Sequence, residues 1–263
     1  MDSILITGGT GHLGQKVAHI LNSTGYPTGI LTSGNRPTDN YENITFYTGD
    51  LVANTGLKEA VQAADIIIHC ASNPRNYQQV DIEGTNNLLK AIAGNSIKHL
   101  VYISIVGVDQ TDYPYYQAKL AVENLLLNSG VPCTVVRTTQ FHHFVFNMIE
   151  TLVKAPGPHH AVLTIPAGLY FQSVSTQEVA ELLVTTALDS AKGLLPDFGG
   201  KEVLSFEEMT AGYLKEFEIN KRIQQEKTDD IRHQLFRSGV NLCPGNKRGK
   251  ESWKAFLRSI HQR

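Results

Sequence analysis

Residues 4–14 read ILITGGTGHLG, an apolar run of mostly β-branched residues followed by a turn with four glycines. The run predicts a strand, and the segment from Leu13 onward predicts a helix. Between them, the spacing Gly9-x-Gly11-x-x-Gly14 is typical of dinucleotide-binding turns, where glycines let the backbone approach a pyrophosphate. A turn that serves packing alone is the alternative, but the order strand, turn, helix favours a cofactor site. The expected cofactor-binding residues are Gly8, Thr10, Gly11, His12, Leu13 and Gly14.

Short β-branched runs alternate with helical patterns through the first 140 residues, which predicts parallel βαβ units. The expected strands are residues 3–7, 28–32, 44–48, 64–69, 99–104 and 133–137, and the expected helices are residues 13–23, 56–62, 80–94, 115–129 and 176–189. The fold class is therefore α/β, a Rossmann-type doubly wound and mostly parallel sheet with a small C-terminal substrate-binding portion.

Regularity weakens after about residue 155, where APGPHH (155–160) predicts a loop. We expect a single domain over residues 1–263, with the dinucleotide-binding core in 1–155 and substrate-pocket elements in 156–263. Ser205 and Glu208 form a capping-box pattern that predicts a helix over 204–219. A solvated helix is expected over 221–237, a turn-rich loop over 241–246, and a final amphipathic helix around Trp253.

Composition excludes several function classes. The 263 residues carry 23 Lys and Arg against 25 Asp and Glu, so a net charge of −2 argues against nucleic acid and anionic membranes as partners. No apolar stretch approaches 18 residues and no basic leader precedes the first strand, which argues against membrane spanning or secretion. The three cysteines have no C-x-x-C spacing, and we expect reduced thiols in a cytoplasmic protein.

The choice between NADP(H) and NAD(H) is predicted from the end of the second strand. An acidic residue there binds the ribose 2′-hydroxyl of NAD, whereas the sequence reads LTSGNR over residues 31–36. Ser33 and Arg36 can instead bind a 2′-phosphate, although Arg36 as a plain loop cation is the alternative. NADP(H) is the preferred cofactor, and NAD(H) remains the second choice.

Four segments together resemble the atypical short-chain dehydrogenase/reductase superfamily, and within it the NmrA-like group of NAD(P)H-binding proteins: residues 7–14, 49–51, 69–72 and 101–104. The resemblance implies that Asp50 and Leu51 lie against the adenine and that Ala71 and Ser72 line the cofactor cleft. It also implies a small-molecule substrate, and a homodimer through the helix at 115–129 is one arrangement of such relatives. The group contains reductases as well as nucleotide-binding regulators, so activity has to be argued at the site.

Tyr115 and Lys119 are the leading catalytic candidates. Asp112 and Pro114 mark a helix start, which places Lys119 one turn after Tyr115 on the same face. A tyrosine hydroxyl has a pKa near ~10, and a neighbouring ammonium favours the phenolate, which suits proton exchange with a substrate oxygen. The spacing resembles the catalytic pair of short-chain dehydrogenases, which implies that Lys119 also reaches the nicotinamide ribose. A surface tyrosine and a helix-face lysine are the alternative.

The family's catalytic serine would be Ser104, but the pair of serines often found there reads Ser104-Ile105. Because side chains alternate along a strand, Ser104 faces away from the cleft if Ile105 holds the family position. Further on, Gln140, Phe141 and His142 fall where the family builds a substrate pocket, or else form a buried helix start. Adjacent histidines diverge on a helix and lack Cys or carboxylate partners, so no metal is expected.

Three functions compete for this sequence. The first is an NAD(P)H-dependent oxidoreductase that reduces a small carbonyl or quinone-like compound by hydride transfer. The second is a non-catalytic NADP(H) sensor that regulates a partner, which the missing second serine favours. The third, a sugar-nucleotide epimerase with bound NAD, is disfavoured because the C-terminal part is short.

Overall fold

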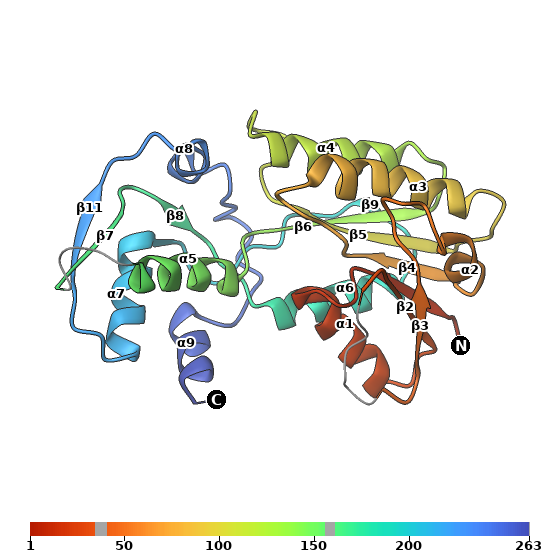
Figure 1. The fold of residues 1–263 in the computed structure, drawn as a ribbon, viewed down its shortest axis with the longest axis horizontal. Coiled ribbons are helices and arrows are strands. Elements are labelled where there is room, and N and C mark those ends of the chain that lie inside the picture. Colours follow the sequence, from red (N-terminus) through yellow and green to blue (C-terminus); the bar gives the residue numbers. More distant parts are fainter. Residues whose placement is uncertain (35–40, 156–160, 263) are drawn as a thin grey trace. The chain divides into compact units, whose positions relative to one another are not determined.

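The structure is a computed structural model that describes residues 1–34, 41–155 and 161–262 (Figure 1). The chain forms two compact units. The sheet unit comprises Met1–Ser104, Pro114–Arg137 and Gln177–Pro196, and the second unit comprises Ile105–Tyr113, Thr138–Thr176 and the chain from Asp197 onward. Each unit therefore contains residues from both sides of position 155, where the sequence places the end of the cofactor-binding core.

A seven-stranded sheet forms the centre of the sheet unit, in the order β3-β2-β1-β4-β5-β6-β9. Its strands are β1 (Ile4–Thr7), β2 (Thr28–Thr32), β3 (Ile44–Thr48), β4 (Ile66–His69), β5 (His99–Ile105), β6 (Cys133–Thr138) and β9 (Gly193–Leu194). The pairs β1–β2, β1–β4, β2–β3, β4–β5 and β6–β9 are all parallel. The predicted Rossmann-type α/β fold is confirmed, and the six predicted strands agree with the observed bounds to within two residues.

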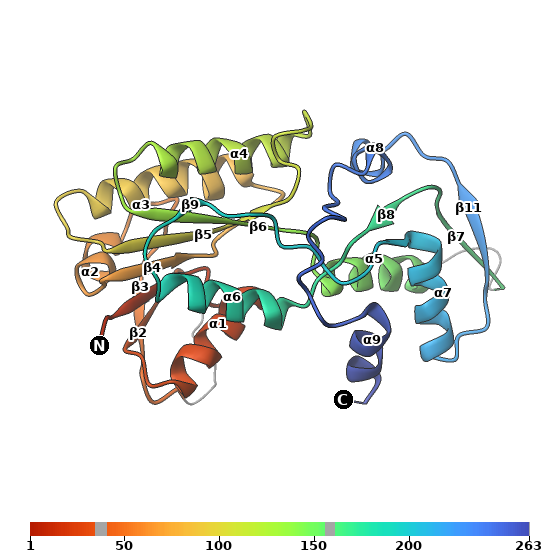
Figure 2. The same ribbon diagram turned by 180° about the vertical axis from the view of Figure 1, so that it is seen from behind.

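Helices cover both faces of this sheet (Figures 1 and 2): α1 and α6 lie on one face, and α2, α3 and α4 on the other. Their bounds are α1 (His12–Ser23), α2 (Leu57–Gln62), α3 (Gly84–Ile92), α4 (Pro114–Leu127) and α6 (Thr176–Ala187). All residues of β1 and β4 are buried, as expected for central parallel strands covered on both sides. A π-helix, η1 (Gln78–Glu83), occupies the start of the helix predicted over 80–94.

In the described residues of the second unit there are two small strand pairs and four helices. Strand β7 (Val162–Pro166) pairs in parallel with β11 (Arg222–Glu226), and β8 (Tyr170–Phe171) pairs antiparallel with β10 (Leu204–Ser205). The helices are α5 (His142–Lys154), α7 (Phe206–Glu216), α8 (Ile231–Ser238) and α9 (Trp253–His261). Aromatic side chains from α5, α7 and α9 pack together in its core, with ring centroids of Phe146 and Phe256 5.9 Å apart.

Two predictions about helix starts have different outcomes here. The capping box is confirmed, because Ser205 Oγ accepts from the Glu208 amide and the Glu208 carboxylate accepts from the Ser205 amide. The helix predicted over 221–237 is wrong in its first half, since residues 222–226 form β11 and the helix begins only at Ile231 after the cap Asp230. The polar run 222–226 becomes a strand because β7 offers it a backbone partner. None of the described helices is long and apolar enough to cross a membrane.

Candidate active site

The glycine turn between β1 and α1 brings the backbone of two strands into contact. Gly8 has φ +68°, and a Cβ added there would lie 2.6 Å from the Ala71 amide nitrogen, beyond the end of β4. A Cβ on Gly14 would collide with the Gly8 carbonyl oxygen, so helix α1 packs directly on the turn. Only glycine fits both conformations and contacts. These contacts show why glycine is needed for packing at positions 8 and 14, and the predicted approach of a phosphate to the turn stays a prediction.

The N-terminus of α1 has no side-chain cap. Its cap residue, Gly11, has no side chain to accept from the first-turn amides, and the first turn of α1 holds no acidic residue. Helices α2 and α5 also lack a side-chain cap, whereas α7, α8 and α9 are capped by the side chains of Ser205, Asp230 and Ser252. Amides that no side chain caps, together with the helix dipole, attract phosphate groups. These features fit the pyrophosphate of a dinucleotide.

The other predicted cofactor residues lie around this turn. Thr10 is half-buried and its carbonyl accepts from Gln15, Leu13 is buried, and His12 is exposed with a pKa that burial and then Lys16 lower. Ser33 is exposed just after β2, and Arg36 lies outside the described residues. The residues predicted to lie at the adenine, Asp50 and Leu51, follow β3.

Asp50 and Leu51 both have structural contacts of their own. Asp50 Oδ1 accepts from the amides of Val52 and Ala53 at 2.7 and 3.0 Å, which shapes the turn after β3. Leu51 is 8% exposed and packs in the core, while its carbonyl accepts from Asn87 at 2.9 Å. Their predicted contact with adenine stays a prediction.

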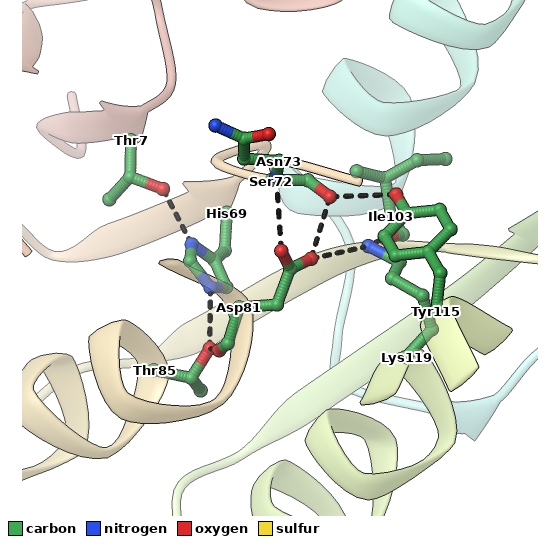
Figure 3. Close-up of polar contacts among 9 residues, drawn as sticks. All are labelled: Thr7, His69, Ser72, Asn73, Asp81, Thr85, Ile103, Tyr115 and Lys119. Carbon is green, nitrogen blue, oxygen red and sulfur yellow. Dashed lines mark hydrogen bonds and ion pairs between the residues drawn. The ribbon is translucent and has the colours of Figure 1, made fainter. Parts of the chain in front are cut away.

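Ser72 and Tyr115 are joined by a hydrogen bond. The two hydroxyl oxygens lie 2.8 Å apart, and Ser72 Oγ also donates to Asp81 Oδ1 at 2.6 Å (Figure 3). The second oxygen of the Asp81 carboxylate accepts from the Asn73 amide at 3.0 Å. Tyr115 itself is half-buried in the first turn of α4, as the Pro114 signal predicts.

Lys119 is fully engaged inside the protein. Its side chain is 3% exposed, and its Nζ lies 3.7 Å from Asp81 Oδ1 and donates to the Ile103 carbonyl at 2.9 Å (Figure 3). The ammonium also lies 4.4 Å from the centre of the Tyr102 ring. Burial lowers the pKa of Lys119, and the Asp81 carboxylate opposes that shift. Its predicted reach to a nicotinamide ribose stays a prediction, because these contacts direct its Nζ toward Asp81.

Asp81 is the site residue that sequence reasoning missed. It is 1% exposed and lies in η1, a short π-helix of the kind that often marks functional sites. A signal was present: Asp81 shares a helical face with Gly84, Thr85 and Leu88, all of which are buried. An acidic residue on the apolar face of a helix needs a partner inside the protein, and Lys119 provides it.

A second series of hydrogen bonds runs from Thr7 through His69 and Thr85 to the backbone of Asp81. His69 Nδ1 lies 2.5 Å from Thr7 Oγ1, and its Nε2 lies 3.0 Å from Thr85 Oγ1, which in turn donates to the Asp81 carbonyl (Figure 3). Burial lowers the pKa of His69 to about 3, so this imidazole is neutral. The neighbouring thiol of Cys70 has a pKa raised to about 12 by burial and is not a nucleophile.

Ser104 is not joined to Tyr115 by a hydrogen bond. It is 1% exposed, and its Oγ has no hydrogen-bond partner among the described residues. The serine that is hydrogen-bonded to Tyr115 is Ser72, which follows β4, and not Ser104 on β5. The catalytic role predicted for Ser104 stays a prediction without a contact to support it.

The predicted substrate residues lie in the second unit. Gln140 is buried and its Oε1 accepts from Asn241 at 3.0 Å, and Phe141 is half-buried at the start of α5. His142 is 1% exposed and its ring stacks on Phe256, with centroids 5.1 Å apart. Burial lowers the pKa of His142 to about 4. Within the described residues, no group of three or more His, Cys, Asp or Glu side chains could hold a metal ion.

Residues 1–252 match the NmrA-like family. The chain belongs to this family. Among curated relatives, an uncharacterized protein of Mycobacterium tuberculosis is 27% identical over 191 residues, which are 71% of this chain and 20% of that protein. This chain thus spans about a fifth of that relative's length. The photosystem II assembly factor Ycf39 of Trieres chinensis is 26% identical over 224 residues, covering 80% of this chain and 69% of the factor.

Solved structures share the whole fold at low sequence identity. A nucleoside-diphosphate-sugar epimerase from Staphylococcus aureus has a TM-score of 0.79 at 18% identity, over 97% of this chain and 99% of that one. An NADPH-dependent quinone oxidoreductase from Escherichia coli, complexed with NADPH, also has a TM-score of 0.79, at 15% identity over 98% and 99%. These likenesses establish the Rossmann-type fold of this chain.

Proposed function

We propose that this NmrA-like protein is an NADPH-dependent reductase of a small carbonyl or quinone-like compound, with Tyr115 as its proton donor. One observation carries the proposal: the Ala71 backbone lies against Gly8 of the phosphate turn, and the next residue, Ser72, is hydrogen-bonded to Tyr115. The expected cofactor turn and the expected acid–base residue are thus joined by two consecutive residues after β4. Ligands of parallel α/β sheets bind at this carboxyl end of the strands.

The cofactor proposal rests on the glycine turn and the uncapped start of α1. The glycines at positions 8 and 14 let the turn pack tightly against the backbone beyond β4 and against the start of α1, and the α1 dipole favours the negative charge of a phosphate. NADPH rather than NADH is proposed because no carboxylate stands at residues 31–34 after β2, and Ser33 is exposed there. Solved structures of the same fold contain NADPH or NAD+, which supports a nicotinamide cofactor of either kind. A bound nicotinamide would supply the hydride.

Tyr115 is proposed to donate its proton to the substrate oxygen, which avoids an unprotonated oxyanion in the product. Ser72 holds the hydroxyl in place at 2.8 Å. The role of Phe141 in a substrate pocket remains a prediction of the sequence, and its side chain is half-exposed in the second unit. His142 is left out, because its buried ring is covered by Phe256.

The test follows NADPH oxidation at 340 nm with 9,10-phenanthrenequinone, 1,4-benzoquinone and a panel of aldehydes as acceptors. Wild type is compared with Tyr115→Phe and with Tyr47→Phe, a matched control on β3. The proposal expects acceptor-dependent oxidation that falls by about 10²-fold or more in Tyr115→Phe and is unchanged in Tyr47→Phe. Equal rates in the two variants would show that Tyr115 is not the proton donor.

A redox sensor is the second candidate, and the engagement of Lys119 favours it. In a catalytic Tyr-Lys pair the ammonium interacts with the cofactor and lowers the pKa of the tyrosine. Here Nζ instead forms an ion pair with Asp81 and donates to the Ile103 carbonyl. A sensor binds NADPH without passing hydride on. Tight NADPH binding by calorimetry, with no oxidation by any acceptor in the panel, is the result expected for a sensor.

A further inference from the structure

Ser72 has a single hydroxyl proton and two hydrogen-bond partners, the Asp81 carboxylate and the Tyr115 hydroxyl. A carboxylate can only accept, so in the 2.6 Å bond to Asp81 the proton belongs to Ser72. Ser72 Oγ must then accept in its 2.8 Å contact with Tyr115, and the tyrosine must be the donor. The direction of both hydrogen bonds therefore follows from Asp81 Oδ1 being the acceptor of the Ser72 proton. A Tyr115 phenolate would compete with Asp81 for the one Ser72 proton.

We propose that the buried Asp81 carboxylate, acting through Ser72, holds Tyr115 protonated, so that this site is built to give a proton to a carbonyl oxygen rather than to take one from an alcohol. Asp81 and Ser72 are positioning residues in this scheme. The consequence for catalysis rests on the proposed reductase function. The protonation state of Tyr115 does not, and it is measurable without substrate or cofactor.

Charges around the tyrosine support this assignment. The titratable groups found around Tyr115, Ser72 and Asp81 in the described part of the chain include Tyr116, Lys119 and Glu123 on α4, Tyr102 on β5, His69 and Cys70 from β4 and its end, and Tyr77 before η1. His69 and Cys70 are neutral near pH 7, and burial raises the pKa of Tyr102 well above its usual value. Glu123 is paired with Arg137 at 2.6 Å.

The remaining charges are Asp81 and Lys119, which lie 3.7 Å apart and oppose each other. Lys119 alone would favour the phenolate of Tyr115, as the Tyr-x-x-x-Lys spacing predicts. Asp81 offsets the charge of that ammonium and also accepts the Ser72 proton. Both effects raise the pKa of Tyr115. Removing the Asp81 charge should thus lower the pKa of Tyr115 by about one to two units.

The experiment measures the pKa of Tyr115 directly. The full chain is labelled with [13Cζ]tyrosine, and its ten tyrosine signals are followed by NMR from pH 7 to 11, with Tyr115→Phe identifying the signal. Asp81→Asn is compared with Glu83→Gln, which removes an exposed carboxylate from the same π-helix. The expected result is a fall of at least one unit in Asp81→Asn and no change in Glu83→Gln. Equal values in the two variants overturn the proposal.

Two further variants keep the test decisive if Asp81→Asn fails to fold. Ser72→Ala leaves the Asp81–Lys119 pair intact and removes only the acceptor of the Tyr115 proton, so the tyrosine pKa should fall by a smaller amount. In Asp81→Asn/Lys119→Met both charges are gone, and the pKa should return toward the wild-type value. An unchanged Tyr115 pKa in Ser72→Ala counts against the proposal. So does a Tyr115 pKa in the double variant that is a full unit below the wild-type value.

Failure of the proposed function has a different signature. NADPH oxidation with 9,10-phenanthrenequinone is followed from pH 6 to 10, where loss of the Tyr115 proton ends the active range. The pH at which the rate falls on the alkaline side of this profile should be lower in Asp81→Asn, by the same amount as the Tyr115 pKa measured by NMR. If no acceptor is reduced while the NMR pKa still falls, the reductase proposal fails and the assignment of Asp81 stands.

Discussion

Replacing Gly8 by alanine tests whether the close approach of the turn to Ala71 is what requires glycine. Gly8 has φ +68°, a conformation that costs an alanine about 1–2 kcal/mol. The added Cβ would also lie 2.6 Å from the Ala71 amide nitrogen, a backbone atom that cannot rotate away. Overpacking of this kind costs a further ~1–3 kcal/mol. The expected loss of unfolding free energy for Gly8→Ala is therefore about 3 kcal/mol.

Gly25→Ala is the matched control, because Gly25 has φ +75° but nothing within 4 Å of an added Cβ. It carries the conformational cost without the collision, so about 1 kcal/mol is expected. Urea unfolding followed by circular dichroism gives both values, and NADPH titration by fluorescence gives the affinity. Because relief of the collision moves Ala71 and Ser72, Gly8→Ala should also weaken NADPH binding by tenfold or more, while Gly25→Ala should not. Equal destabilisation by the two substitutions would refute the close-approach argument.

Three other predictions follow from individual contacts. Ser33→Asp should lower the affinity for NADPH at least tenfold relative to NADH, since a carboxylate repels a 2′-phosphate; titration with both cofactors checks this. The pKa of His69 is about 3 in the folded state against 6.5 unfolded, so protons bind the unfolded chain preferentially and stability falls as pH drops from 6.5 toward 3, by up to ~1.4 kcal/mol per pH unit. Urea unfolding at pH 7.5 and 5 should show a smaller drop in His69→Asn. Glu123→Gln leaves Arg137 buried without its ion pair and should cost ~3–5 kcal/mol, whereas Asp189→Asn in an exposed pair should cost under ~1 kcal/mol by the same assay.

The sheet unit could be predicted from the sequence because its signals are local. Each central strand is a short β-branched run, and each helix carries an apolar face, so strand bounds such as 28–32 and 44–48 were predicted to the residue. The second unit was harder. Strand β11 (Arg222–Glu226) is polar and mostly exposed, and it exists because it pairs with β7 from 60 residues earlier in register Arg222 to Val162. Such long-range pairing leaves no mark on the strand's own residues.

The site shows the same division between local and long-range information. The glycine turn and the Tyr-x-x-x-Lys spacing are each contiguous in the sequence. The structure places the first before α1 and the second on α4. The pairing of Tyr115 with Ser72 joins residues 43 positions apart, and no spacing rule indicates it. Ser104, which the family pattern favours, is buried with no hydrogen-bond partner among the described residues. A serine position in the sequence therefore does not establish which hydroxyl meets the tyrosine.

Charge balance is the part of the site that a motif cannot convey. The spacing of Tyr115 and Lys119 fixes how far apart they lie on α4, but the effect of the lysine depends on whether its charge is compensated. The buried carboxylate of Asp81, held in place by the π-helix and the Asn73 amide, lies 3.7 Å from Nζ. In a buried region an ammonium and a carboxylate at that distance cancel most of each other's field at a third group. The same Tyr-x-x-x-Lys motif can thus favour a phenolate in one protein and a protonated phenol in another, and the residue that decides between them is an acid on a different helix.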